Sequence, residues 1–309
     1  MELYSIKGNK LHTIELEPFK KEREIQDLVE KNTERLFGIE FISSEFRINE
    51  FRIDSLCFDN ETNSFVIIEY KKGSSYSVID QGYSYLSKML NNKDSFILEY
   101  CRKKKVSVDV DVDWSQSRVI FVSPSFNSYQ KNSVNFQDIP FELWEIKRFS
   151  NNTFVLNQQL SNSKESINLS NKVKTNKENS IIGSVSKEIK IYSEEDHIEK
   201  CDPDIKNLYF TLKNKILEWD NIRMKPMKKH IGFWDNKNMF VYFNTKKNSI
   251  KITLVKGYTG TKTEKFILQD PKGLFKIFKN KWKELYQYSL KEEKDIDYLL
   301  MMIKQKLEF

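Results

Sequence analysis

Two apolar segments with charged residues embedded in them constrain this chain more than any other feature of its sequence. Residues 51–58 (FRIDSLCF) and 65–71 (FVIIEYK) are rich in aromatic and β-branched side chains, and the polar residues 59–64 (DNETNS) separate them. Side chains of this kind favour strands, and a short polar segment between two such runs favours a turn. The pattern therefore predicts two neighbouring strands, largely buried and joined by a turn.

The register of these strands brings charged side chains together. If Phe58 pairs with Phe65, then Asp54 lies opposite Glu69. Two carboxylates that face each other on a sheet repel, and their apolar neighbours partly deprive them of water. A divalent cation between them would remove both costs, because oxygen ligands are those that Mg²⁺ prefers. Lys71 projects from the same face as Glu69 and can reach the attacking water or a phosphate, so the group suits hydrolysis of a phosphodiester.

The same residues also have a simpler interpretation. Asp54 can lie on a solvated edge, and Glu69 and Lys71 can belong to an ordinary strand end, where charged residues are common. A Glu-X-Lys motif by itself is weak, since it occurs by chance in most proteins. The choice between the two interpretations depends on the neighbouring elements.

Composition argues against several classes of enzyme. The three histidines and three cysteines are scattered, so neither a zinc site, a disulfide framework nor a histidine-activated nucleophile is indicated. The nine glycines form no phosphate-binding loop. The N-terminus lacks the apolar core of a signal peptide, and no run approaches the roughly 18 apolar residues of a membrane span. We therefore expect a soluble cytoplasmic protein whose chemistry rests on carboxylates and lysines.

Hydrophobic periodicity outlines two folded regions. It predicts helices at 20–36, ended by Gly38, and at 78–90, 204–219 and 296–307. It predicts strands at 45–58, 65–71, 118–123, 239–244 and 249–255, a final edge strand of the first region at 141–146, and a short strand or hairpin within 1–20. Residues 150–190 are polar and aromatic-poor, which predicts a flexible linker between domains at 1–149 and 191–309.

Five segments of the first region together support the nuclease interpretation. They are residues 24–32 (EIQDLVEKN), 52–54 (RID), 68–71 (IEYK), Gln81 with Tyr85, and 118–124 (RVIFVSP). In this order they resemble the PD-(D/E)XK nuclease superfamily, and within it the C-terminal catalytic domains of archaeal NucS-type and RecB-like nucleases. The resemblance spans about 20–149 and implies an α/β restriction-endonuclease-like domain with a central mixed sheet flanked by helices. Two departures are the lack of a proline before Asp54 and the presence of Tyr70 where the family has an aliphatic residue.

The resemblance also implies roles for individual residues. Asp54 and Glu69 would hold Mg²⁺, for which Mn²⁺ would substitute, and the backbone carbonyl of Tyr70 would be a further ligand. Lys71 would orient the attacking water or stabilise charge in the transition state. Gln81 would help to position the phosphate or the water.

Glu24 would assist the metal through a water-mediated contact. For Glu24 the alternative is an ordinary glutamate on a polar helix face, as Glu22, Glu30 and Glu34 on the same predicted helix are. For Gln81 the alternative is a polar residue near a helix N-terminus. Both alternatives remain open from the sequence.

The second region resembles an uncharacterised bacterial domain family that is often labelled "predicted transport protein". The matching stretches are residues 192–200, 247–252 and 295–300. The label carries no mechanism. We expect a smaller α+β C-terminal domain that binds nucleic acid or a protein partner.

Charge separates the two regions. Residues 1–150 hold 21 Lys and Arg against 24 Asp and Glu, a net charge of −3, whereas residues 151–309 hold 30 against 20, a net charge of +10. Basic residues interleaved with aromatic ones suit contact with a nucleic acid, although a solvated basic face is the simpler explanation of any single patch. The candidate nucleic-acid contacts are Lys72, Lys225, Lys228, Lys229, Lys279, Lys281 and Lys283.

These observations favour a magnesium-dependent DNA endonuclease that acts in restriction, phage defence or DNA repair. One alternative is a catalytically idle nuclease fold that binds nucleic acid or a protein partner. The intact set of Asp54, Glu69 and Lys71 argues against it, because an idle site has no reason to keep an unstable pair of carboxylates. A signalling or transport-associated interaction protein is a third interpretation, and a homodimer or a partner bound through the C-terminal domain is left open.

Overall fold

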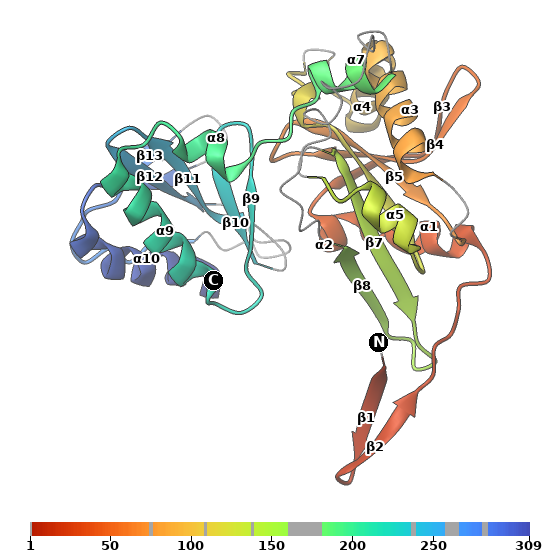
Figure 1. The fold of residues 1–309 in the computed structure, drawn as a ribbon, viewed down its shortest axis with the longest axis horizontal. Coiled ribbons are helices and arrows are strands. Elements are labelled where there is room, and N and C mark those ends of the chain that lie inside the picture. Colours follow the sequence, from red (N-terminus) through yellow and green to blue (C-terminus); the bar gives the residue numbers. More distant parts are fainter. Residues whose placement is uncertain are drawn as a thin grey trace. The chain divides into compact units, whose positions relative to one another are not determined.

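The chain forms two compact units, Met1–Ile191 and Tyr192–Phe309, each with its own sheet and core (Figure 1). The structure is a computed structural model that describes residues 2–73, 77–107, 110–136, 139–159, 181–235, 239–256, 266–279 and 284–309. Within these ranges, no helix is both long enough and apolar enough to cross a membrane.

The first unit is built on a six-stranded mixed sheet in the order β3-β4-β5-β6-β7-β8. Its strands are β3 (Glu40–Ile48), β4 (Phe51–Asp59), β5 (Ser64–Tyr70), β6 (Arg118–Ser123), β7 (Phe141–Arg148) and β8 (Phe154–Gln159). The pairs β5–β6 and β6–β7 are parallel, and the other pairs are antiparallel. Because both faces of the central strands are covered, these strands are continuously apolar.

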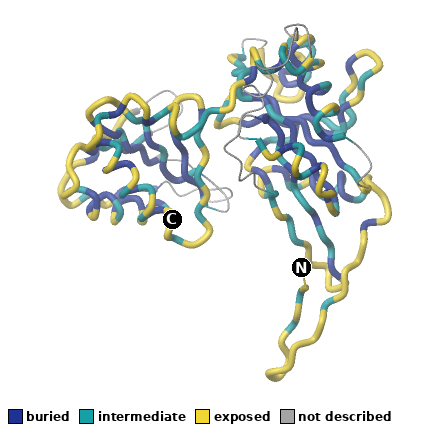
Figure 2. The backbone as a smooth tube through the Cα atoms, in the orientation of Figure 1, coloured by how far each residue is buried: buried dark blue, intermediate teal, exposed yellow. Residues whose placement is uncertain are grey.

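Helices cover both faces of this sheet. One core joins the sheet to α1 (Glu22–Glu30) and α2 (Thr33–Phe37). The opposite core joins it to α3 (Val78–Asn91), α4 (Lys93–Lys104) and α7 (Ile181–Glu188), with the 3₁₀ turn η1 (Trp114–Gln116) beside it and α5 (Ser128–Ser133) next to α3. The unit is thus a mixed α/β structure in which a buried sheet lies between two helical layers, as the dark interior in Figure 2 shows.

The predicted hairpin of the central strands is confirmed, because Phe58 pairs with Phe65. The predicted helix at 20–36 is wrong in one respect, since it is two helices. Asn32 leaves the helical conformation with φ of −134°, and its side chain donates to the carbonyl of Leu28, so the first helix ends there. Gly38, at φ of 68°, ends the second helix as expected.

The predicted strand at 45–58 also divides in two. Asn49 adopts a left-handed conformation with φ of 54°, which asparagine tolerates better than most residues, and the chain turns back there. The result is a hairpin of β3 and β4. The prediction did not include α4, which follows α3 after a break at Asn92.

The predicted linker at 150–190 is wrong at both of its ends. Strand β8 pairs with β7, so β7 is not the edge strand that the sequence predicted. Helix α7 packs against α3, and its residue Val185 is buried together with Ile189 in the core on the α3 side of the sheet. Both elements therefore belong to the first unit, while residues 160–180 lie outside the described residues.

Helix α3 approaches the sheet closely at Gly82. A methyl group at this position would lie 2.6 Å from two ring carbons of Phe141 on β7, which is closer than non-bonded carbon atoms come. The absence of a side chain at Gly82 therefore sets the distance between α3 and the sheet.

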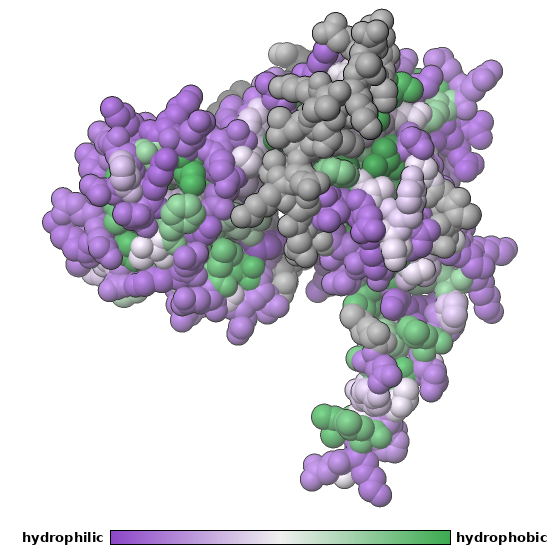
Figure 3. All heavy atoms as spheres, in the orientation of Figure 1, coloured by the Kyte–Doolittle hydropathy of each residue, from purple (hydrophilic) through white to green (hydrophobic). Residues whose placement is uncertain are grey.

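The chain begins with a hairpin of β1 (Leu3–Lys7) and β2 (Lys10–Ile14). The hairpin extends away from the main sheet of its unit (Figure 1), and a bridge between Leu16 and Phe149 joins its base to the sheet. Its side chains are largely exposed, including those of Ile6 and Leu11. In Figure 3 the hairpin contributes hydrophobic surface to a molecule that is otherwise mostly hydrophilic in that view.

The second unit is an antiparallel six-stranded sheet in the order β13-β14-β12-β11-β10-β9. Its strands are β9 (Arg223–Pro226), β10 (Ile231–Trp234), β11 (Met239–Lys246), β12 (Ser249–Lys256), β13 (Lys276–Lys279) and β14 (Glu284–Leu290). Its helices are α8 (Glu194–Ile198), α9 (Pro203–Leu217) and α10 (Ile296–Glu308), with the 3₁₀ turn η2 (Glu293–Asp295). The helices predicted at 204–219 and 296–307 and the strands predicted at 239–244 and 249–255 are confirmed.

Candidate functional site

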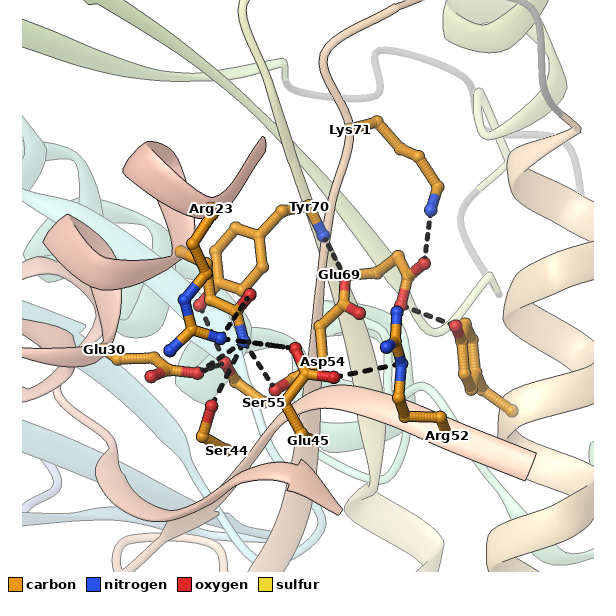
Figure 4. A network of polar contacts seen from close by, with 12 residues as sticks. Arg23, Glu30, Ser44, Glu45, Arg52, Asp54, Ser55, Glu69, Tyr70 and Lys71 are labelled. Carbon is orange, nitrogen blue, oxygen red and sulfur yellow. Dashed lines mark hydrogen bonds and ion pairs between the residues drawn. The ribbon is translucent and has the colours of Figure 1, made fainter. Parts of the chain in front are cut away.

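The candidate site lies where β4 and β5 separate. Their recorded pairing ends at Ser55 and Ile68. Beyond this pair, the backbone N–H of Tyr70 donates to Oδ2 of Asp54 at 3.1 Å, which holds the carboxylate against the Glu-X-Lys segment (Figure 4). A pocket of about 350 Å³ opens at this point. Its lining residues are Glu22, Arg23, Gln26, Glu45, Arg52, Asp54, Glu69, Tyr70, Lys71 and Tyr85.

Glu69 is the most buried charged group of the pocket, with only 2% of its surface exposed. Three side chains donate hydrogen bonds to its carboxylate: Lys71 Nζ at 2.5 Å, Gln81 Nε2 at 2.8 Å and the Tyr85 hydroxyl at 2.5 Å. Lys71 reaches it from the same strand, and Gln81 and Tyr85 reach it from one face of α3, four residues apart. These bonds compensate for the loss of water and fix the orientation of the carboxylate.

Burial destabilises the negative charge on both acids. Burial raises the pKa of Glu69, the nearby Asp54 carboxylate raises it further, and the hydrogen bonds from Lys71 and Tyr85 offset only part of this. Burial likewise raises the pKa of Asp54, against the opposing effects of the Tyr70 N–H and Lys71. Burial lowers the pKa of Lys71, but its contact with Glu69 outweighs burial and leaves the pKa raised. Lys71 is therefore charged at neutral pH.

This donor set fits a hard divalent cation. Asp54 and Glu69 offer carboxylate oxygens whose charges lack full compensation, and Tyr70 lines the same pocket. Among the described residues, no group of three or more His, Cys, Asp or Glu side chains could hold a metal. An ion bound here would therefore keep several water ligands, as Mg²⁺ commonly does and structural zinc does not.

Glu24 does not lie at this site, which corrects the prediction for it. Its carboxylate is 3.5 Å from Nη1 of Arg148 and accepts a hydrogen bond from the Lys20 N–H at 3.4 Å. Glu22 lines the pocket instead. Side chains two residues apart on a helix point about 160° apart, so Glu22 and Glu24 lie on nearly opposite faces of α1.

The predicted role of Gln81 is also modified. Its side-chain amide donates to Glu69 and lies 3.3 Å from the Tyr85 hydroxyl, and Gln81 is not part of the pocket wall. In this structure Gln81 therefore contacts the Glu69 carboxylate, and its role toward a phosphate or water stays a prediction.

The sequence analysis missed a second group of residues in the same pocket: Arg23, Gln26, Glu45 and Arg52. Gln26 is 5% exposed and donates to the backbone carbonyl of Asp54 at 3.0 Å. A polar residue next to the buried Ile25 on α1 was the available signal. Arg52, two residues before Asp54 on the same strand face, was another.

The predicted nucleic-acid contacts lie outside this pocket. Lys72 is exposed, and its ammonium group donates to the Lys20 carbonyl at 2.7 Å. Of the predicted contacts in the second unit, Lys225, Lys228 and Lys229 are exposed. Lys279 ends β13, but its side chain, like Lys281 and Lys283, lies outside the described residues.

Comparison with known proteins places the whole chain in a family. It is 40% identical over 314 residues to a protein of Haemophilus influenzae named "Uncharacterized protein", and the match covers 100% of both chains. The chain belongs to the same family as that protein, whose name assigns no chemistry. Residues 194–309 match a family model described as "Domain of unknown function (DUF5655)", which agrees with the expectation of an uncharacterised C-terminal domain.

Three solved structures show partial similarity. A repair endonuclease from Pyrococcus abyssi is 21% identical, with a TM-score of 0.24, over 38% of this chain and 44% of that one. An EndoMS–dsDNA complex is 18% identical, with a TM-score of 0.24, over 42% and 47%. EndoMS in its apo form is 15% identical, with a TM-score of 0.25, over 43% and 58%. The chain thus spans about half of each of these proteins, and similarity at this level assigns no function to it.

Proposed function

We propose that the first unit is a magnesium-dependent phosphodiesterase that hydrolyses DNA, with a site of the PD-(D/E)XK type on a restriction-endonuclease-like fold. The observation that carries this proposal is the pair of carboxylates, Asp54 and Glu69, whose pKa values are both raised in one polar pocket beside a charged Lys71. Burial makes such a pair of charges unfavourable in the folded protein, and a bound cation would remove much of that cost.

The residues of the pocket divide the work of hydrolysis. Asp54 and Glu69 would hold the ion, and Mg²⁺ supplies Lewis-acid polarisation of the phosphate when bound. Lys71 would stabilise the negative charge that develops on the phosphate. Its contact with Glu69 would keep its ammonium group next to the metal ligands. Gln81 and Tyr85 would keep the Glu69 carboxylate in one orientation while the ion and substrate exchange.

One observation favours the idle alternative, in which the fold binds nucleic acid or a protein partner without cleaving. Glu69 already accepts three hydrogen bonds from protein groups, so its charge is partly compensated without a metal. The alternative predicts that Mg²⁺ does not bind. The proposed enzyme and the idle fold therefore differ in a direct measurement.

The test is cleavage of single-stranded, duplex, nicked and mismatched DNA, and of RNA, by the purified full chain with Mg²⁺, Mn²⁺ or EDTA. Asp54→Asn and Glu69→Gln should abolish metal-dependent cleavage. Glu24→Gln is the matched control, because this helix acid pairs with Arg148 outside the pocket. The proposal is wrong if no substrate is cleaved, or if Asp54→Asn cleaves as fast as the unmodified protein. The biological setting of restriction, phage defence or repair follows only from the substrate that is found.

A further inference from the structure

Glu45 has an unusual backbone conformation in the middle of β3. Its φ is 53°, in the left-handed region that residues other than glycine, asparagine and aspartate rarely adopt. The pairs Ser44–Ser55 and Phe46–Ile53 flank it, so Glu45 lies opposite Asp54 across the β3–β4 hairpin. A strained conformation persists only where the surrounding contacts enforce it, and such positions cluster at functional sites.

Three donors hold the Glu45 carboxylate. Arg52 Nε lies 3.0 Å from one of its oxygens, and Arg23 Nη1 and Gln26 Nε2 lie 3.5 Å and 3.1 Å from the other. The buried Gln26 amide also donates to the Asp54 carbonyl, so one side chain fixes Glu45 relative to Asp54. The two guanidinium groups are therefore placed at a defined position beside the candidate metal ligands (Figure 4).

The two arginines are more than a pair of surface charges. Their side chains are 54% and 55% exposed, yet both line the pocket. Arg23 also pairs with Asp27, through Nε at 2.8 Å. Arg52 makes a single recorded ion pair, through Nε, and within the described residues its two terminal nitrogens have no recorded partner. Such a pair of N–H groups matches the oxygens of a phosphate.

The charge of the pocket requires such groups. Four carboxylates line it, those of Glu22, Glu45, Asp54 and Glu69, and they would repel a polyanion. The cations in the lining are Lys71, which is bound to Glu69, and the two arginines. The side chains of the two arginines are about twice as exposed as that of Lys71, so they offer the more accessible donors.

We propose that Arg23 and Arg52 form a clamp for a backbone phosphate of the nucleic acid, next to the phosphate that is cleaved, and that Glu45 holds the two guanidinium groups in place for it. The clamp rests on the proposed nuclease function, since it names the group of the substrate that binds beside the catalytic acids. It assigns to the strained Glu45 the task of orienting cations rather than that of a metal ligand.

The test is the affinity of the full chain for a short fluorescein-labelled DNA duplex, measured by anisotropy in EDTA over a range of salt concentrations. Arg23→Gln and Arg52→Gln should each weaken binding about tenfold, because each removes a charge-assisted contact. Each should also reduce the slope of log affinity against log salt by about one. Arg52→Lys keeps the positive charge but loses the paired N–H donors of the guanidinium group. It should therefore keep the salt dependence of binding and bind DNA more tightly than Arg52→Gln but less tightly than the unmodified protein.

Arg35→Gln is the matched control, because Arg35 is an exposed arginine of the same unit that does not line the pocket. Exposed ion pairs contribute little to stability, so all of these variants should fold, as circular dichroism would verify. If Arg23→Gln and Arg52→Gln bind DNA like Arg35→Gln, the clamp is wrong, even when the unmodified protein cleaves DNA with Mg²⁺. If both lose affinity and salt dependence while the unmodified protein cleaves nothing, Arg23 and Arg52 do bind a backbone phosphate, and it is the proposed catalysis that is wrong.

Discussion

Replacing Asp54 with asparagine should make the metal-free protein more stable and abolish its response to Mg²⁺. Without a metal, the folded chain pays for two carboxylates whose pKa values are raised by burial and, for Glu69, by the charge of Asp54 itself. An asparagine oxygen can still accept the hydrogen bond that the Tyr70 N–H donates to Asp54. The substitution therefore removes a destabilising charge without leaving this donor unpaired.

The expected magnitude follows from these contacts. A tenfold change in proton affinity between the folded and unfolded chain corresponds to about 1.4 kcal/mol. Asp54 is partly buried and is attracted by Lys71 and Arg52, so two opposing effects act on its charge. Single substitutions typically change stability by about 1 kcal/mol, and we expect a net gain of that order near pH 8. For a unit the size of Met1–Ile191, this gain raises the melting temperature by about 2–4 °C. Mg²⁺ at about ten times its Kd should stabilise the unmodified protein by about 1.4 kcal/mol.

Differential scanning calorimetry in EDTA and in Mg²⁺ measures both effects. The unmodified protein should melt at a higher temperature with Mg²⁺, whereas Asp54→Asn should melt higher in EDTA and show no further rise with Mg²⁺. Glu24→Gln should respond to Mg²⁺ as the unmodified protein does, because Glu24 lies outside the pocket. A lower melting temperature for Asp54→Asn in EDTA, together with an intact response to Mg²⁺, would refute the reasoning.

Three further predictions concern pH, the rate of cleavage and the second unit. The folded-state pKa values of Asp54 and Glu69 lie above their ordinary values of 3.8 and 4.5. Between the ordinary and the raised pKa values, these two acids therefore bind more protons in the folded protein than in the unfolded one. The contribution of these two acids to the metal-free free energy of unfolding should therefore fall as pH rises through their pKa values. In urea titrations, the stability of the unmodified protein relative to the Asp54→Asn variant should fall over this pH range, and a rise in that difference would contradict the raised pKa values. Lys71→Ala should lower kcat far more than it weakens DNA binding, and equal losses in kinetic and binding measurements would make Lys71 a phosphate anchor instead. Replacing Lys225, Lys228 and Lys229 together with glutamine should weaken non-specific DNA binding and flatten its salt dependence, and an unchanged slope would remove these lysines from the interface.

The sequence was sufficient for the centre of the first unit. The turn at 59–64 sets the pairing of Phe58 with Phe65, and the alternation of a strand then places Lys71 on the face of Glu69. The sequence did not show that the predicted helix at 20–36 divides, because one side-chain hydrogen bond of Asn32 decides where α1 ends. It also did not show β8, because this polar segment becomes a strand only by pairing with β7.

The site shows the same division. Asp54, Glu69 and Lys71 could be grouped because a period of two fixes the faces of a strand. The helix acid could not be chosen, because Glu22 and Glu24 differ only in helical phase, and the phase depends on where α1 begins. The role of Glu45 in the pocket was not predicted, because no sequence pattern indicates that a glutamate adopts a left-handed backbone conformation.

The close approach of α3 at Gly82 has a consequence for how this protein tolerates mutation. Any side chain at position 82 must displace either the Phe141 ring or the helix that carries Gln81 and Tyr85, the two residues that orient the Glu69 carboxylate. If the proposed function holds, a genetic screen for inactive alleles should therefore recover substitutions of Gly82, although this residue does not line the pocket. Such variants would still fold, but their Glu69 carboxylate would no longer have the correct orientation. A second substitution that places a smaller side chain at position 141 should make room for the new side chain and restore activity.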